Sequence, residues 1–208
     1  MSELPLRDNI ERARAITDAA LAETDDQVRD AYSWRYLGDP ILHTPTRLVE
    51  QADMAHVVSV LEPALCRHMR SAWVDSVGVS ANQIGSELRV CLAMLSTDPE
   101  KPNSAKREPQ LLINPRITER SAEVVNRAQE GCLSIPNFRT SMRRHTWIVV
   151  AYTDALGHPR QRKLRGFDAQ IVQHEIDHLN GKTILDDVPR QQRRAAERAV
   201  HAYLSRRS

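Results

Sequence analysis

The segment HEIDH at residues 174–178 constrains this chain more than any other part of its sequence. In an α-helix, residues four apart lie on one face about one turn apart, so both histidines of the segment can reach a single metal ion. The glutamate between them, Glu175, is close enough to act on a water molecule at that ion without binding the ion itself. The apolar spacing predicts a helix over Phe167–Leu179, with Gly181 placed to end it.

A catalytic metal site needs a third protein ligand, and the identity of that ligand separates the possible enzyme classes. Extending the motif to HExxHxxGxxH fails, because Ile184 stands where the third histidine would be. A thermolysin-like site would take an acid from a later helix, and Glu197 is available there, although arginines flank it. The remaining candidate is Cys132 in EGCLSIP at 130–136, a glycine-bearing, proline-ended segment that suits an open thiolate.

Three motifs occur in order along the chain: SVGVSANQ at 76–83, EGCLS at 130–134 and QHEIDHLNG at 173–181. Together they resemble the three motifs of the peptide deformylase family. GDPIL at 38–42 and LLINPRI at 111–117 also look like parts of that family. The resemblance runs from about residue 36 to residue 188 and therefore includes both the histidine helix and the cysteine segment.

The resemblance implies a metal ion held by Cys132, His174 and His178, with water as the fourth ligand. It also implies the reaction, which is hydrolysis of the formyl group from nascent chains that begin with N-formylmethionine. Fe²⁺ is the native metal that the family suggests. A thiolate with two imidazoles is a mixed soft and borderline donor set, so Zn²⁺, Ni²⁺ or Co²⁺ would also bind.

The same resemblance assigns the catalytic groups around the metal. Glu175 would take a proton from water as general base and pass it to the leaving amine. The side-chain amide of Gln83 and the backbone N–H of Leu133 would stabilise the oxyanion. These roles agree with general chemistry, because a metal ion supplies hydroxide at neutral pH by lowering the pKa of its bound water.

Helical spacing also indicates where a substrate side chain would lie. Phe167 and Ile171 share one helix face with both histidines, so they are candidates for an apolar pocket beside the metal, with Val77 opposite. Such a pocket suits the unbranched side chain of methionine. The family resemblance adds candidates for holding the peptide backbone, namely Gly78, Gly131 and Arg139.

Two positions depart from the family pattern in the first motif. Ser76 stands where the family's first glycine usually lies, and Ser80 replaces the first of two alanines. Both changes fall in the substrate loop and leave the predicted ligands intact. They keep open an alternative, a deformylase-like hydrolase of another N-formyl substrate.

The charged residues predict one further partner. The whole chain carries 29 Lys and Arg against 27 Asp and Glu, so its net charge does not by itself indicate nucleic-acid binding. The last helix, which Pro189 can start, concentrates basic residues that are candidates for RNA contact, namely Arg190, Arg193, Arg194, Arg198, Arg206 and Arg207. Some bacterial members of the family dock on the ribosome through such a helix.

The organisation of the chain predicts an α+β fold, with short antiparallel or mixed strands around a central metal-binding helix. We expect an N-terminal helical extension over 1–33, a metallohydrolase domain over 34–188 and a basic C-terminal helix over 189–208. The three cysteines are too few for a disulfide framework. The chain also has no apolar run long enough to span a membrane and no secretory signal. Together with the few cysteines, these features predict a cytoplasmic protein.

Local patterns add a set of predicted elements. A long helix is expected over Leu48–Trp73, with Pro63 as a kink or a break. Ser96–Pro109 is expected to be a long loop, because it holds three prolines and shows no periodicity. Strands are predicted at Leu88–Leu95, Leu111–Asn114, Ile117–Asn126, Trp147–Thr153 and 159–165.

Overall fold

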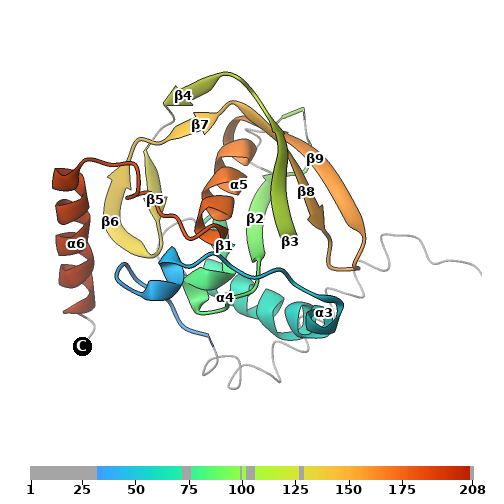
Figure 1. The fold of residues 1–208 in the computed structure, drawn as a ribbon, viewed down its shortest axis with the longest axis horizontal. Helices are drawn as coiled ribbons and strands as arrows, with labels where there is room; N and C mark the ends of the chain where they lie inside the picture. The colour runs from blue at the N-terminus through green and yellow to red at the C-terminus, as the bar shows by residue number, and fades with distance from the viewer. Residues whose placement is uncertain (1–31, 72–75, 99, 102–105, 127–128, 207–208) are drawn as a thin grey trace, which may run out of the picture.

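The computed structural model describes residues 32–71, 76–98, 100–101, 106–126 and 129–206 (Figure 1). Its main sheet is antiparallel, with the strand order β1-β2-β3-β8-β9. These strands are β1 (Gly78–Ser80), β2 (Val90–Ser96), β3 (Arg107–Arg120), β8 (Trp147–Thr153) and β9 (Pro159–Arg165). Two smaller antiparallel pairs join β4 (Val124–Asn126) to β7 (Arg143–His145), and β5 (Glu130–Cys132) to β6 (Ile135–Thr140).

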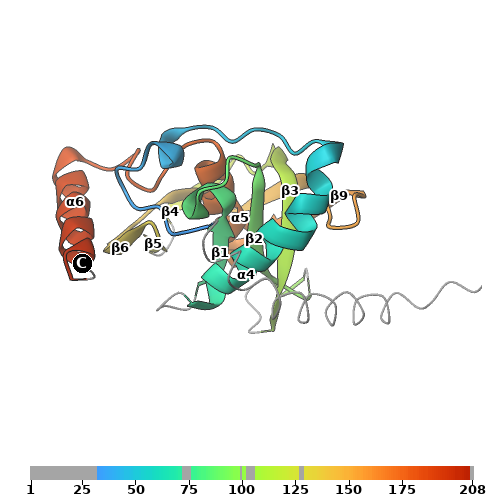
Figure 2. The same cartoon turned by 90° about the horizontal axis from the view of Figure 1, so that it is seen from below.

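The helices lie on both sides of this sheet and beyond it. They are α3 (Met54–His56), α4 (Glu62–Ser71), α5 (Gly166–Leu179) and α6 (Arg190–Leu204). Short 3-10 turns cover Pro40–His43, Gln51–Asp53 and Ala81–Ile84. Both ribbon views place α5 at the centre, between the main sheet and the β5–β6 hairpin, with α6 on the outer side of that hairpin (Figure 2). The expected α+β class is confirmed, and the named strand pairs are all antiparallel.

Strand β2 shows why the sheet is covered on both faces. Val90 and Leu92 pack into one hydrophobic cluster with α4, whereas Cys91, Ala93 and Leu95 pack into a second cluster with α5. Successive side chains of a strand point to opposite faces, so a strand buried on both sides is apolar throughout. This burial explains the continuous apolar run that predicted the strand.

The long helix is present but begins later than predicted and changes pitch. Helical turns run from Gln51 to Ser71, and Val57–Leu61 forms a π-helical stretch just before Pro63. Proline lacks an N–H and its ring crowds the carbonyl four residues earlier. The wider π turn accommodates that proline, so the helix continues through it instead of breaking.

The loop predicted over Ser96–Pro109 is shorter than expected. Ser96 is the last residue of β2, and β3 begins at Arg107, where the two strands still pair. The strands expected over Leu111–Asn114 and Ile117–Asn126 are present but divided differently, since Arg107–Arg120 is the single 14-residue strand β3 and Val124–Asn126 is the separate strand β4. The prolines of β3 are tolerated for local reasons. Pro109 lies where β3 pairs with β2 alone, and Pro115 lies in a register shift against β8.

Other predictions are confirmed closely. Strands β8 and β9 have the predicted bounds, α5 ends at Leu179, and α6 starts directly after Pro189. The predicted N-terminal extension falls almost entirely outside the described residues. Helix α6 packs against β6 and buries Ala196 and Val200 in one cluster with Cys132. The division of the chain at residues 33 and 189 stays a prediction.

Gly181 closes α5 and turns the chain back against the Pro40–His43 segment. Its φ is +74°, and a Cβ there would lie 2.8 Å from the backbone oxygen of His43. Gly157, in the β8–β9 turn, has a similar φ of +82° but open space around it. The two glycines therefore share a backbone conformation and differ in crowding.

We predict that Gly157→Ala costs about 1 kcal/mol of unfolding free energy, from the left-handed backbone alone. Gly181→Ala should cost about 2–4 kcal/mol, because the collision with His43 adds to that strain. Urea unfolding of both variants beside the wild type measures the difference. Equal losses of unfolding free energy would show that the contact between residue 181 and the His43 backbone does not destabilise Gly181→Ala.

Candidate metal centre

Three side chains bring their ligand atoms together between α5 and the β5–β6 hairpin. The Sγ of Cys132 and the Nε2 atoms of His174 and His178 all lie within 4.8 Å of one another. The Nε2 of His178 lies 3.2 Å from the Cys132 sulfur and 3.2 Å from the Nε2 of His174. Among the described residues, no other three His, Cys, Asp or Glu side chains group their ligand atoms in this way.

Each element delivers its ligand for a local reason. The i, i+4 spacing on α5 sets the two imidazole rings at 4.8 Å between centroids. The opposite face of α5, which includes Val172 and Ile176, packs on the sheet and fixes the rotation of the helix. Cys132 is the last residue of β5, directly before the two-residue turn Leu133–Ser134, so its sulfur projects toward α5.

A buried ion pair orients the first histidine. Arg144 on β7 donates two hydrogen bonds to Glu130, at 2.9 and 2.8 Å. The Nδ1 of His174 donates to the same carboxylate at 3.0 Å, so its Nε2 faces the cluster and can bind a metal ion once it has lost its proton. Arg144 also donates to Asp177 on α5. Sequence reasoning missed Arg144, because nothing in its Arg-rich stretch distinguishes it, and it assigned Glu130 no role, although Glu130 opens the cysteine motif.

The electrostatics favour a thiolate. Burial by itself would raise the pKa of Cys132, but His178 and hydrogen bonds from both histidines outweigh it and lower that pKa to about 5. Although burial opposes it, the pKa of His174 rises well above its usual value, because Cys132 and Glu130 both accept from the ring. A thiolate with two imidazoles fits a divalent metal ion of borderline softness.

Two further predicted residues lie at the same place. The side chain of Gln83 is buried, and its Nε2 lies 3.5 Å from the Cys132 sulfur and 3.2 Å from the hydroxyl of Ser134. Its Oε1 accepts from the backbone N–H of Ser80 at 3.0 Å, which fixes the direction of the amide. Glu175 is 3% exposed, and burial raises the pKa of its carboxyl above the usual range.

The residues predicted to bind substrate lie near this centre on several elements. Gly131 and Arg139 face each other across the β5–β6 pair, and Arg139 is exposed. A Cβ on Gly78 would overlap the Glu175 carboxylate, so the two groups are in close contact. These placements are compatible with a substrate chain between β1 and β5, and the binding roles stay predictions.

The three residues predicted to line the methionine pocket do not all lie together. Ile171 is buried in the cluster between α5 and the sheet, and Val77 packs partly exposed against the same cluster. Phe167 is 38% exposed, and the guanidinium of Arg107 lies 4.8 Å from the centre of its ring. Val77 and Ile171 are thus together, whereas Phe167 lies at the start of α5 beside Arg107.

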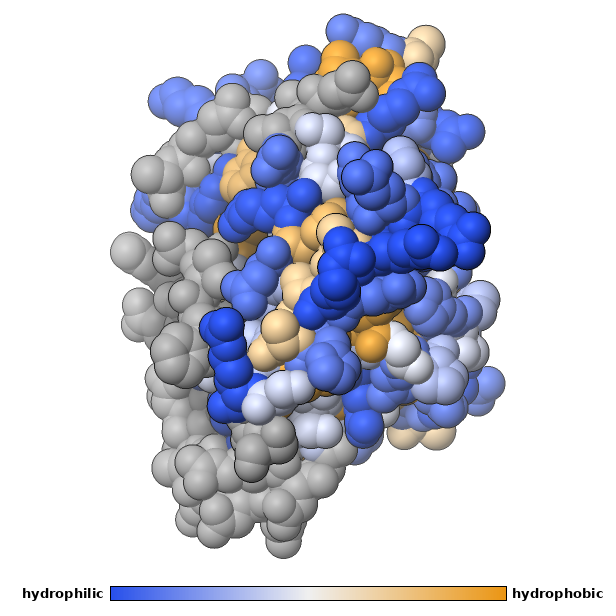
Figure 3. Space-filling view, turned by 90° about the vertical axis from the view of Figure 1, so that its left-hand side faces the viewer, coloured by the Kyte–Doolittle hydropathy of each residue, from blue (hydrophilic) through white to orange (hydrophobic). Residues whose placement is uncertain are grey.

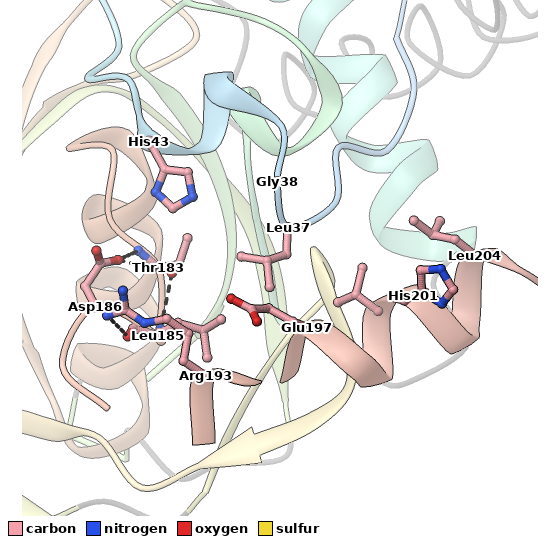
Figure 4. A pocket seen from close by; sticks show the side chains of 11 residues that line it. Leu37, Gly38, His43, Thr183, Leu185, Asp186, Arg193, Glu197, His201 and Leu204 are labelled. Atoms are coloured by element: carbon pink, nitrogen blue, oxygen red, sulfur yellow. Dashed lines mark hydrogen bonds between the residues drawn. The ribbon is translucent and has the colours of Figure 1, made fainter. Parts of the chain in front are cut away.

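Glu197, the candidate ligand for a thermolysin-like site, lies elsewhere. Figure 4 shows its side chain projecting from α6 into a separate pocket of about 420 Å³, beside Leu37 and Arg193. It is not part of the cluster of cysteine and histidines. The structure therefore provides Cys132, and not Glu197, as the third donor beside His174 and His178.

Comparison with known proteins shows which family the chain resembles. The sequence profile of the family described as polypeptide deformylase matches residues 33–194. Peptide deformylase 2 of Nostoc sp. is 33% identical over 152 residues, which is 73% of this chain and 83% of that protein. The peptide deformylase of Synechocystis sp. is 32% identical over 173 residues, which is 83% of this chain and 87% of that protein.

Solved structures agree with the sequence relatives. Peptide deformylase from Ehrlichia chaffeensis matches with a TM-score of 0.71 and 26% identity, covering 85% of this chain and 96% of that one. The enzyme from Synechococcus elongatus, in complex with actinonin, matches with a TM-score of 0.68 and 29% identity, covering 83% and 87% of the two chains. In the part of the chain that the structure describes, no helix combines the length and apolar character needed to cross a membrane.

We predict that Cys132 of the metal-free protein ionises at a much lower pH than the other two cysteines. Cys132 should stay a thiolate at neutral pH and lose its thiolate absorbance as the pH falls through about 5. Burial raises the pKa of Cys66 to about 11 and raises the pKa of Cys91 well above its usual range, so both remain thiols there. Ultraviolet titration after chelation measures this, and Cys132→Ser should remove the acidic step. If the first thiolate of the wild type formed only near pH 9, the histidines would not lower the pKa of Cys132.

Proposed function

The chain belongs to the peptide deformylase family, and on that premise we propose that Cys132, His174 and His178 hold its catalytic metal ion. Members of this family are metal-dependent hydrolases that remove the formyl group from the N-terminus of nascent polypeptides, and this chain is such an enzyme. The observation that supports the residue roles is the convergence of one sulfur, two imidazole nitrogens and the Gln83 amide at one point.

A metal ion held by Cys132, His174 and His178 would supply Lewis acidity that makes water nucleophilic at neutral pH. Glu175 takes the proton that water loses on attacking the formyl carbon, and gives it to the amine as the C–N bond breaks. The buried site disfavours charge on Glu175, which suits a group that must hold a proton briefly. The Nε2 of Gln83 and the backbone N–H of Leu133 donate to the developing oxyanion.

We assign the peptide backbone of the substrate to the edges at Gly78 and Gly131, with Arg139 at the outer side. The methionine side chain would lie against Val77 and Ile171, which share one apolar cluster beside the histidine helix. Phe167 would contribute at the entrance, because a large part of its ring is exposed.

We propose Fe²⁺ as the native metal and the cytoplasm as the location. The donor set of thiolate and imidazoles accepts Fe²⁺, and it also accepts Zn²⁺, Ni²⁺ and Co²⁺. Iron beside a thiolate is sensitive to oxidation, so metal analysis requires anaerobic preparation. None of the three cysteines forms a disulfide, which agrees with a reducing compartment.

Formate release from a short formyl-Met peptide is the direct test of the catalytic assignment. Anaerobically prepared, Fe²⁺-loaded wild type should release formate, and Glu175→Ala should lose about 10²-fold or more of the rate because no base remains beside the water. Metal content should be unchanged in Glu175→Ala and lost in Cys132→Ala.

Glu197→Ala is the matched control, since it removes a carboxylate on α6 outside the cluster. It should retain both metal and activity, whereas a thermolysin-like enzyme would lose both. A fully loaded wild type that releases no formate from the peptide but hydrolyses a small formamide would favour the alternative N-formyl substrate. Release from neither would contradict the assignment.

We also propose that α6 docks on ribosomal RNA through its basic face. Arg190, Arg194 and Arg198 are exposed on this helix, while Ala196 and Val200 hold it to the hairpin. Figure 3 faces this side of the molecule, where hydrophilic side chains dominate the visible surface around smaller apolar patches. Clustered arginines that neutralise phosphates give binding that weakens steeply with salt.

Replacing Arg190, Arg194 and Arg198 by glutamine should weaken co-sedimentation with ribosomes and reduce its salt slope by about one unit per lost phosphate contact. Deleting residues 190–208 is a poorer test, because it removes buried side chains beside Cys132. The control replaces three exposed arginines of the main sheet, namely Arg116, Arg120 and Arg165. Equal ribosome binding by the two triple variants would exclude docking through α6.

A further inference from the structure

Ser80 places a buried hydroxyl against the proposed general base. It is the last residue of β1 and is fully buried. Its Oγ donates to the Oε2 of Glu175 at 2.6 Å, and the main-chain oxygen of Glu175 lies 3.1 Å from the same hydroxyl. A hydroxyl has one proton to donate, and the shorter distance to a charged acceptor favours the carboxylate.

The second oxygen of that carboxylate is confined by shape. A Cβ added at Gly78 would overlap Oε1, so the carboxylate occupies the space above the Gly78 Cα. Among the described residues, the hydrogen bonds to the Glu175 side chain come from Ser80 and reach Oε2. Strand β1 therefore holds one oxygen by a hydrogen bond and limits the other by contact.

Ser80 also contacts the second catalytic side chain. Its backbone N–H donates to the Oε1 of Gln83 at 3.0 Å, which directs the Nε2 of that amide toward the Cys132 sulfur. One residue thus fixes both the carboxylate assigned to proton transfer and the amide assigned to the oxyanion. Only the first of these contacts uses the serine side chain.

We propose that Ser80 is a positioning residue for formyl hydrolysis, whose hydroxyl holds Oε2 of Glu175 and leaves Oε1 for the reaction. The inference rests on the proposed role of Glu175. The terminal torsion of a glutamate is broad, so an unheld carboxylate samples many orientations. Misplacing a catalytic group by about 1 Å can cost about 10²-fold in rate, and loss of this one hydrogen bond should cost less.

Ser80→Ala removes the hydroxyl, including its share in a capping box with the Gln83 backbone, and leaves the Ser80 N–H that donates to the Gln83 amide in place. The variant should lower kcat about tenfold, with KM for a formyl-Met peptide changed less than twofold and metal content unchanged. Ser96→Ala is the matched control, because Ser96 is equally buried and its hydroxyl donates to main-chain oxygens away from the site. It should leave kcat unchanged.

A double-mutant cycle separates positioning from packing. If Ser80 acts through the Glu175 carboxylate, Ser80→Ala should have no further effect on the residual kcat of Glu175→Ala. A tenfold loss in both backgrounds, or wild-type kcat in Ser80→Ala, would overturn the inference. The wild type and Glu175→Ala are compared first. If the wild type releases no formate, or if Glu175→Ala keeps its rate, the proposed function fails before the role of Ser80 is tested.

Unfolding of the metal-free proteins provides a readout without activity. Ser80→Ala should lower the melting temperature by about 5 °C when Glu175 is present, and by clearly less in the Glu175→Ala background. The main-chain oxygen of residue 175 survives in both backgrounds. Equal shifts would therefore assign the hydroxyl to that oxygen and refute its hold on the carboxylate.

Discussion

The ion pair between Arg144 and Glu130 is the interaction on which the metal centre depends. It joins β7 to β5, and through His174 and Asp177 it joins both strands to α5. A buried guanidinium is costly unless its donors are satisfied, and here two carboxylates satisfy them. Because Glu130 also accepts from the Nδ1 of His174, the carboxylate that stabilises the buried arginine also orients a proposed metal ligand.

Helix α5 packs on the main sheet with one face and meets the β5–β6 hairpin with the other, and the cluster of cysteine and histidines lies on the hairpin side. Val172, Ile176 and Leu179 pack on the sheet, which makes the helix a structural element of the main core. The other face carries the histidines toward a short hairpin whose turn follows Cys132. The metal centre therefore lies where two hydrophobic clusters meet, and each cluster fixes one side of it.

The parts of the fold that could be predicted are those set by local sequence. The spacing of HEIDH and the position of Gly181 predict α5 and its end, because both depend on helix geometry alone. The sequence predicts strand β3 only in part, because the prolines up to Pro109 indicate a loop, and only tertiary pairing shows that neither Pro109 nor Pro115 needs a ladder donor. The contact of Ser80 with Glu175 joins residues 95 apart, so no local pattern could reveal it.

Helix α6 carries the exposed arginines on one face and contacts the cysteine cluster with the other. Ala196 and Val200 share a cluster with Cys132, so the helix that carries the exposed arginines also closes the apolar environment behind the thiolate. Cys132 is only 8% exposed, which restricts the access of oxidants to a sulfur whose low pKa makes it reactive. The apolar face of α6 thus covers the proposed metal ligand while its basic face stays on the surface, and this packing contributes to the burial of the thiolate.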